Sequence, residues 1–342
     1  MLEADPAGSV VVEPAGRRRH GHADGMKMDK IRIGVVGIGH LGRYHLQKYD
    51  KMEHCEIVGA ADIVEERAAR AAALHGCRAM TDYRAMIGAV DAVSVAVPTQ
   101  CHHAVAGAFL KAGVHVLLEK PIAETLDQAD ELIALADRNG LVFQIGFVER
   151  FNPAVVALHK VIGRPLFIES HRLHPFFERG TDVDVILDLM VHDLDIILHF
   201  VDSPLEDIDA VGTAVLSDKV DIANARLRFR NGCAANVTAS RISVKTMQKI
   251  RFFGLEGYHA VDFAKRDLLS LQRVKKAEGQ IEIIQNQIEI LQKDPLEQEI
   301  RTFVDAIVQE TPTPVPASEG RRVLEVALQI VDEIKTSQEK LS

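Results

Sequence analysis

A glycine-rich turn between an apolar strand and a helix constrains the fold of this chain more than any other feature. Segment 31–49, IRIGVVGIGHLGRYHLQKY, opens with β-branched residues, passes through three glycines and continues with a helical apolar pattern. Gly37, Gly39 and Gly42 have the GxGxxG spacing of dinucleotide-binding turns, with the required strand before them and helix after them. The first glycine makes the tight turn, the second lets the backbone approach a pyrophosphate, and the third allows close helix packing.

The N-terminus of the helix after this turn is expected to face the phosphates. It offers unpaired N–H groups and the positive end of the helix dipole. We therefore predict that the turn and the first helical residues bind a dinucleotide: Gly37, Ile38, Gly39, His40, Leu41 and Gly42.

Asp62 ends the next predicted strand, CEIVGAAD, and lies 20 residues beyond Gly42. A carboxylate at this point can accept hydrogen bonds from the adenosine ribose hydroxyls and would repel a 2′-phosphate. Asp62 therefore favours NAD over NADP as the cofactor. The alternative is that Asp62 only caps the helix that follows.

Apolar strands and helical stretches alternate through the first half of the chain. The strands AVSVAVP, HVLLEKP and LVFQIGF are preceded by helical patterns at 64–74, 104–112 and 126–138, respectively. Such strands indicate a parallel sheet with helices on both faces. We predict a doubly wound α/β domain over residues 28–148, with its ligand beyond the carboxyl ends of the strands. Residues at those ends complete the predicted cofactor-binding set: Pro98, Thr99, His102, Glu119 and Lys120.

The second half of the chain, 149–342, is predicted to be an α+β domain with a large, mostly antiparallel sheet. Turn signals such as Asn231-Gly232 make hairpins of several apolar stretches. The predicted strands are 165–173, 208–216, 222–230, 233–242, 249–263, 268–274 and 281–291. Two amphipathic helices near the C-terminus, 296–309 and 320–334, are expected to serve packing.

Composition excludes several classes of protein. The formal net charge of −9 argues against a general nucleic-acid binder. The four cysteines lack CxxC spacing, which suits reduced thiols in a cytoplasm. No apolar run approaches a membrane span, and the N-terminus lacks the apolar core of a signal peptide. We expect a cytoplasmic protein that binds neither nucleic acid nor membranes.

Residues 1–27 have no apolar periodicity and are expected to form a disordered tail. Two alternatives remain. Translation could start at Met26 or Met28, or the basic cluster at 17–20 could serve as a functional arm.

Segment 184–195, DVILDLMVHDLD, places four carboxylates and one imidazole in an apolar run. We predict a helix over 184–200 that begins with Asp182 or Asp184 as N-cap and ends before Ser203-Pro204. Positions 188, 192 and 195 would then share a polar face. The adjoining apolar stripe would bury the helix against the second domain: Leu187, Val191, Leu194 and Leu198.

Several motifs together resemble those of the Gfo/Idh/MocA oxidoreductases: GVVGIGHLG, VPTQCHH, EKP and DLMVHDLD. Members of that family act on sugars, cyclitols and nucleotide sugars with NAD or NADP. The resemblance extends from residue 31 to the C-terminal VPASEGRRVLEVAL. It implies a Rossmann domain followed by a substrate-binding domain whose sheet forms a homo-oligomer, either a dimer or a tetramer.

The resemblance also implies a catalytic trio of Lys120, Asp188 and His192. In this interpretation His192 is the general base, Asp188 orients its ring, and Lys120 holds the substrate hydroxyl. Asp195 completes an HxxD ending, whereas Met190 replaces a glycine common in the family. Two alternatives were considered: a hydrogen-bonded pair without chemistry, and a metal site. Neighbouring residues on a helix point apart and no further His or Cys cluster is present, so we expect no metal.

The junction GFVERFNPAV places Arg150 and Asn152 between the domains and resembles that of family members acting on nucleotide sugars. Arginine suits bidentate phosphate contacts, and an interdomain salt bridge is the alternative. The predicted substrate-binding residues are Arg150, Asn152, Arg172 and Asp195, with His174 and Arg179 as further candidates.

These observations lead to an expected activity, the NAD-dependent oxidation of a secondary hydroxyl of a nucleotide sugar, with C3 of UDP-N-acetylglucosamine as first candidate. The ketone would feed an aminotransferase in amino-sugar synthesis for lipid A or another surface glycan. One alternative is a free-sugar or inositol dehydrogenase. Another is a sensor or corepressor that binds NAD without turnover.

Overall fold

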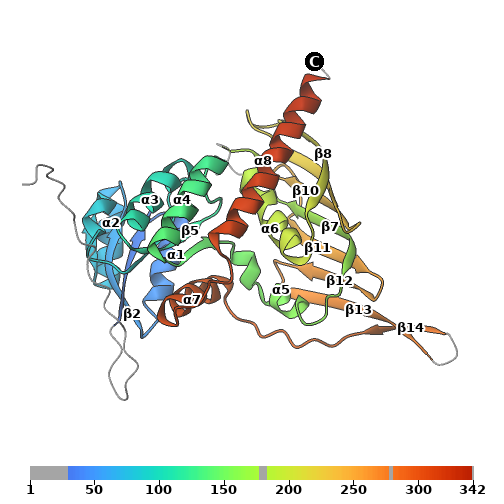
Figure 1. The fold of residues 1–342 in the computed structure, drawn as a ribbon, viewed down its shortest axis with the longest axis horizontal. Coiled ribbons are helices and arrows are strands. Elements are labelled where there is room, and N and C mark those ends of the chain that lie inside the picture. The colour runs from blue at the N-terminus through green and yellow to red at the C-terminus, as the bar shows by residue number, and fades with distance from the viewer. Residues whose placement is uncertain (1–29, 177–182, 277–279, 341–342) are drawn as a thin grey trace, which may run out of the picture.

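The computed structural model describes residues 30–176, 183–276 and 280–340. The predicted tail (1–27), Arg179 and Asp182 lie outside these residues. The described chain folds into two domains, each built on its own sheet (Figure 1).

The first sheet has six parallel strands in the order β3-β2-β1-β4-β5-β6. Because the order reverses between β1 and β4, the carboxyl ends of these two strands flank the crevice where such sheets bind ligands. The doubly wound prediction is confirmed. The strands are β1 (Ile31–Val36), β2 (Cys55–Ala61), β3 (Arg78–Met80), β4 (Ala92–Val95), β5 (His115–Glu119) and β6 (Phe143–Gly146).

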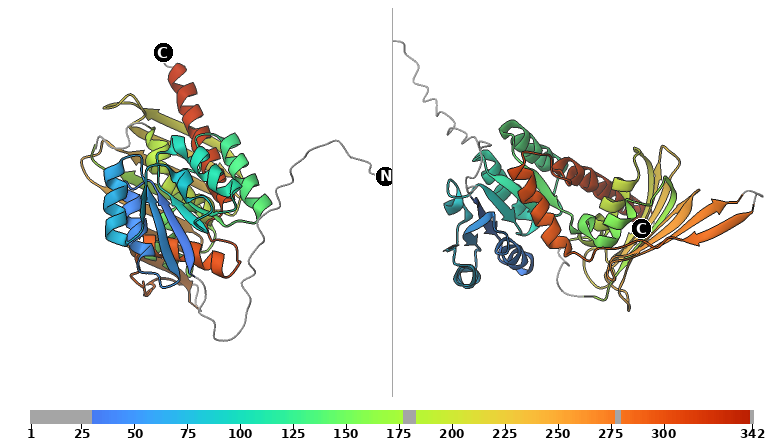
Figure 2. Two further views of the ribbon diagram at one scale, coloured as in Figure 1. Left: turned by 90° about the vertical axis from the view of Figure 1, so that its left-hand side faces the viewer. Right: turned by 90° about the horizontal axis from the view of Figure 1, so that it is seen from below.

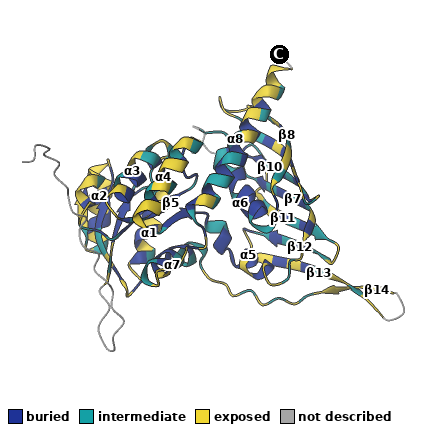
Figure 3. Cartoon of the chain, in the orientation of Figure 1, coloured by how far each residue is buried: buried dark blue, intermediate teal, exposed yellow. Residues whose placement is uncertain are grey.

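Helices α1 (His40–Tyr49), α2 (Glu65–His75), α3 (His102–Lys111) and α4 (Leu126–Asn139) connect these strands. Two short 3-10 helices, η1 (Tyr83–Met86) and η2 (Thr99–Cys101), lie beside β4 in the sequence. Figure 3 shows that exposed residues concentrate on the outer sides of α2 and α4, whereas the strands between the helices are buried.

Helix α7 (Pro295–Val308) comes from near the end of the chain but packs on the first sheet. Asp294 caps its N-terminus by accepting a hydrogen bond from the Glu297 N–H, and proline occupies its first position. Its buried face, formed by Ile300, Phe303 and Val304, shares one core with Ile33 of β1. The C-terminal part of the chain therefore completes the core of the N-terminal sheet.

The second sheet has eight strands in the order β14-β13-β12-β11-β7-β10-β9-β8. Neighbours are antiparallel except β7 and β10, so the predicted mostly antiparallel sheet is confirmed. The predicted stretch 249–263 is two strands joined by a tight turn. The strands are β7 (Pro165–Leu173), β8 (Leu205–Thr213), β9 (Ile222–Phe229), β10 (Ala234–Ser240), β11 (Met247–Gly254), β12 (Gly257–Asp262), β13 (Asp267–Lys275) and β14 (Ile281–Gln285).

One face of this sheet is covered by helices α5 (Pro153–Leu158), α6 (Val191–Phe200) and α8 (Ala317–Glu339). Helix α8 contacts α4 and β6 of the first domain as well as α6 and β8 of the second. Figures 1 and 2 show it crossing from one domain to the other. None of the described helices is both long enough and apolar enough to span a membrane.

Candidate active site

The dinucleotide-binding turn has the backbone geometry that its glycines predict. Gly37 has a φ of +88°, and a Cβ at this residue would lie 2.4 Å from the Ala96 carbonyl oxygen. A Cβ on Gly42 would lie only 1.9 Å from the Gly37 carbonyl oxygen, so α1 can approach the turn only with glycine there. Gly39 faces open space, and no side chain caps the N-terminus of α1. The turn therefore fits a dinucleotide diphosphate, which would accept hydrogen bonds from the backbone N–H groups at the N-terminus of α1.

Asp62 supports this turn from the end of β2. Its carboxylate is buried and accepts hydrogen bonds from the N–H of Ile38 at 2.7 Å and of Val64 at 2.8 Å. The capping alternative is not what the structure shows, because Val64 is the N-cap of α2 and no described side chain caps this helix. A carboxylate has about four acceptor sites, so Asp62 retains the capacity to accept from ribose hydroxyls as well.

Replacing Asp62 with alanine is expected to weaken NAD binding relative to NADP, because the charge that repels a 2′-phosphate is removed. The variant also leaves two N–H groups without their acceptor, which costs about 1–3 kcal/mol of folding free energy. Titrations with both cofactors measure the ratio of the two dissociation constants. Glu66→Ala, on the exposed first turn of α2, is the matched control. An unchanged ratio in the Asp62 variant would contradict the ribose assignment.

Two residues of the predicted cofactor set point into the domain. The ring nitrogens of His102 lie 2.8 Å from the Pro121 carbonyl oxygen and 2.9 Å from that of Val97. The carboxylate of Glu119 lies 3.1 Å from Nε2 of His45. Both side chains lie near the carboxyl ends of β4 and β5, which Pro98, Thr99 and Lys120 follow in the sequence.

The predicted helix 184–200 contains an unforeseen π-helical turn. Residues Ile186–Met190 form this turn, η4, and α6 follows directly. A π-turn inserts extra residues into a helix and rotates the side chains before it relative to those after it. The helix begins at Asp184, because its carbonyl oxygen accepts from the N–H groups of Leu187 and Asp188. Its carboxylate accepts from the N–H of Val220 at 2.9 Å and does not cap the helix.

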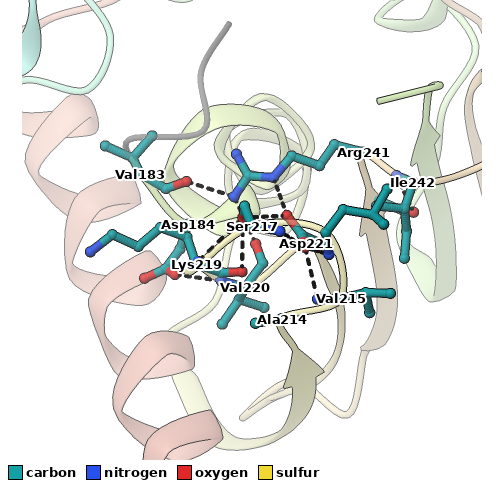
Figure 4. Close-up of polar contacts among 12 residues, drawn as sticks. Val183, Asp184, Ala214, Val215, Ser217, Lys219, Val220, Asp221, Arg241 and Ile242 are labelled. Carbon is teal, nitrogen blue, oxygen red and sulfur yellow. Dashed lines mark hydrogen bonds and ion pairs between the residues drawn. The ribbon is translucent and has the colours of Figure 1, made fainter. Parts of the chain in front are cut away.

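A buried ion pair anchors the start of this segment (Figure 4). The Arg241 guanidinium donates to Asp221 and to the carbonyl oxygens of Val183 and Val220. Burial opposes the charge of Asp221, but hydrogen bonds from Ser217 and from the N–H groups of 215–217 outweigh burial and lower its pKa. No sequence signal predicted this anchor, because its members are distant in the chain.

The three residues predicted as a catalytic trio lie near one another, but with different partners than predicted. Nζ of Lys120 donates to the Asp188 carbonyl oxygen at 2.6 Å and lies 3.5 Å from its carboxylate. Asp188 therefore holds Lys120, and no hydrogen bond joins it to His192 among the described residues. The π-turn explains this difference, because it changes the angle between Asp188 and His192.

His192 is suited to accept a proton. Burial lowers its pKa well below the ordinary value, and the positive charges of Lys120 and Arg172 lower it further. Its Nδ1 is buried without a hydrogen-bond partner in the described structure. At neutral pH the ring is uncharged and can act as a base.

The predicted substrate residues are engaged in buried networks. Arg150 is 8% exposed and donates two hydrogen bonds, of 2.7 and 2.8 Å, to the carboxylate of the fully buried Asp195. It also donates to Glu319 of α8 and contacts His199. Burial disfavours the Arg150 charge, but the carboxylates of Asp195 and Glu319 outweigh burial and raise its pKa. Arg150 therefore forms salt bridges with Asp195 and Glu319 within the protein, as the alternative to phosphate binding predicted.

Arg172 and Asn152 have protein partners as well. Arg172 donates to Asp193 at 2.7 Å and to Glu149 at 3.1 Å. Asn152 caps α5 and donates to the Phe263 carbonyl oxygen. Sequence reasoning missed Glu149, Asp193 and Glu319, since nothing local marks them as partners. His174 lies at the end of β7 and contacts the neighbouring Pro175 carbonyl oxygen.

The fold and this site define a class, the oxidoreductases that bind NAD on a Rossmann domain. A family model described as an oxidoreductase family with an NAD-binding Rossmann fold matches residues 31–147. The GFO/IDH/MocA C-terminal domain model matches residues 158–259. The chain belongs to the GFO/IDH/MocA oxidoreductases, which confirms the resemblance and NAD as the cofactor.

Individual relatives cover most of the chain. It is 39% identical over 305 residues to UDP-N-acetylglucosamine 3-dehydrogenase of Acidithiobacillus ferrooxidans, covering 89% of this chain and 97% of that one. A solved structure of that enzyme superimposes with a TM-score of 0.83, covering 90% and 99% of the two chains. Myo-inositol 2-dehydrogenase of Thermotoga maritima is 25% identical over 86% and 93% of the two chains. Levoglucosan dehydrogenase in complex with NADH, at 20% identity and a TM-score of 0.80 over 90% and 98%, shares the fold.

Proposed function

We propose that this protein is an NAD-dependent dehydrogenase that oxidises a secondary hydroxyl of a nucleotide sugar, namely C3 of UDP-N-acetylglucosamine. The observation that carries the proposal is the 39% identity, over 89% of the chain, to an enzyme with that name. Lys120 directly follows β5 at the carboxyl edge of the NAD-binding sheet, and its charge is near enough to lower the pKa of His192; both observations support the proposal.

The residues at this edge divide the chemistry between them. When bound, NAD accepts the hydride at C4 of its nicotinamide ring. His192 takes the hydroxyl proton, and its lowered pKa keeps it ready to do so at neutral pH. Lys120 donates a hydrogen bond to the same oxygen and stabilises the negative charge that develops there. Asp188 holds Lys120 in place through its carbonyl and carboxylate oxygens.

Arg150, Asn152, Arg172 and Asp195 contribute differently from the phosphate contacts first expected. Their donors and acceptors are taken by protein groups at the junction of η3 (Val148–Phe151), α6 and α8. We propose that they fix the shape of the substrate site and do not touch the diphosphate.

The proposal is tested by mixing the protein with NAD and UDP-N-acetylglucosamine and following NADH absorbance. A parallel reaction contains a 2-oxo acid, which would reoxidise retained NADH, and the sugar is analysed by mass spectrometry. We expect a product that lacks two hydrogen atoms. Free N-acetylglucosamine and myo-inositol serve as comparison substrates. Turnover of either of these alone would favour the free-sugar alternative, and NAD binding without turnover of any substrate would favour the sensor.

Three further aspects are proposed with this activity. The ketone would be consumed by an aminotransferase in amino-sugar synthesis for lipid A or another surface glycan, in a cytoplasmic reaction.

The uncovered face of the second sheet would form the interface of a dimer or tetramer. Phe167, Phe253 and Tyr258 support this, because their rings form a contiguous aromatic row on neighbouring strands β7, β11 and β12.

A further inference from the structure

A second cluster of titratable side chains lies behind the active-site edge, inside the first domain. His45 of α1, Glu119 at the end of β5 and Glu299 of α7 are at most 9% exposed. One ligand atom from each residue lies within 4.8 Å of those of the other two. The crevice chemistry described above uses none of these side chains directly.

Glu299 is the unusual member of the cluster. It is fully buried, and neither carboxylate oxygen has a hydrogen-bond partner in the described structure. No lysine or arginine in the described part of the chain forms an ion pair with Glu119 or Glu299. A buried carboxylate without such compensation is costly.

Two chemical species could relieve this buried charge. A proton on Glu299 needs an acceptor for its O–H, and the Glu119 carboxylate in the same cluster is a candidate. A cation between the three side chains would instead receive one ligand atom from each, since these atoms lie within 4.8 Å of one another.

The surroundings of His45 suit a metal ligand. Its Nδ1 lies 3.1 Å from Oγ of Ser94, which in turn lies 2.8 Å from the hydroxyl of Tyr49. Metal-binding histidines nearly always donate their second ring N–H to such a partner, which fixes the ring and its tautomer. Nε2 lies 3.1 Å from Oε1 of Glu119, where a ring N–H would donate to the carboxylate. A cation would replace this proton, and the ring would then donate Nδ1–H to Ser94.

We propose that His45, Glu119 and Glu299 bind one divalent cation of the zinc or manganese class. One imidazole and two carboxylates are ligands that these ions accept, at bond lengths of about 2.0–2.2 Å. Ligand atoms around a tetrahedral ion with such bonds are about 3.4 Å apart. The three ligand atoms here lie within 4.8 Å of one another, so the side chains would move slightly closer on binding. The cation neutralises two buried carboxylates and ties α7 to α1 and β5. Its role is structural, and it is independent of the proposed substrate.

The test starts with the full chain, without an affinity tag and purified in buffers free of chelator. Elemental mass spectrometry is expected to find about one equivalent of a divalent transition metal per chain. Removing the metal with a chelator is expected to lower Tm, and adding Zn²⁺ or Mn²⁺ alone is expected to restore it. These two measurements on the wild type require no variant to fold.

Glu299→Gln then locates the site. It keeps the shape of a neutral glutamic acid and is expected to lose most of the metal. Asp305→Asn, which removes an exposed carboxylate from the same helix, is expected to keep it. Wild-type protein that holds no metal and gains no stability from Zn²⁺ or Mn²⁺ would overturn the proposal, as would equal metal content in Glu299→Gln and wild type.

Discussion

Replacing His192 with glutamine lowers kcat/KM for the sugar substrate by about 10²–10⁴, the usual contribution of a general base. Glutamine keeps polarity and similar size but cannot take the hydroxyl proton. NAD binding should stay within a few-fold of wild type, because His192 lies outside the dinucleotide-binding turn. Steady-state kinetics and a cofactor titration measure the two effects separately.

His54→Gln is the control for this variant, because His54 is exposed and lies in the turn between α1 and β2. Activity of His192→Gln within a few-fold of wild type would rule out the proposed mechanism for any substrate. The pH profile gives a second check. Since burial and two cations lower the pKa of His192, the base stays uncharged as the pH falls, and the acidic limb of kcat/KM should lie below the ordinary histidine value of about 6.5.

Replacing Arg150 with methionine is expected to reduce the free energy of unfolding by about 3–5 kcal/mol. Methionine fills much of the space but leaves the buried carboxylate of Asp195 without its partner, and Glu319 and His199 each lose a contact. Urea unfolding followed by circular dichroism gives the difference.

Arg301→Met is the matched control for the Arg150 variant. Arg301 pairs with Glu297 on the exposed side of α7, where such pairs contribute about 1 kcal/mol or less. If both variants lost the same free energy of unfolding, the Arg150 network would contribute no more to stability than an exposed ion pair. A free energy of unfolding for Arg150→Met close to wild type would contradict its assignment as a structural anchor.

Much of the fold was predictable because its signals are local. The glycine spacing at 37–42 and the alternation of apolar strands with helical patterns identified a doubly wound domain without any tertiary information. β3 was missed, because three residues are too few to show a period. The π-turn at Ile186–Met190 was missed because its residues read like those of an ordinary helix.

The candidate site was predictable only in part, for a related reason. Lys120, Asp188 and His192 were proposed from motifs, but no motif indicates that the backbone carbonyl of Asp188, inside a π-turn, accepts from Lys120. The partners of Arg150 lie 45 and 169 positions away in the chain. A sequence pattern can mark an arginine at a domain junction, but it cannot tell whether a carboxylate of the protein or a phosphate of the substrate will meet it.

The position of α7 has a consequence for the synthesis of this protein. During translation the N-terminal sheet emerges first, yet the helix that covers Ile33 and its neighbours is made only after the whole second sheet. Until then one flank of the nucleotide-binding domain lacks its apolar cover, and such transiently exposed surface favours aggregation. The N-terminal domain therefore cannot complete its apolar core until residues 295–308 have been synthesised.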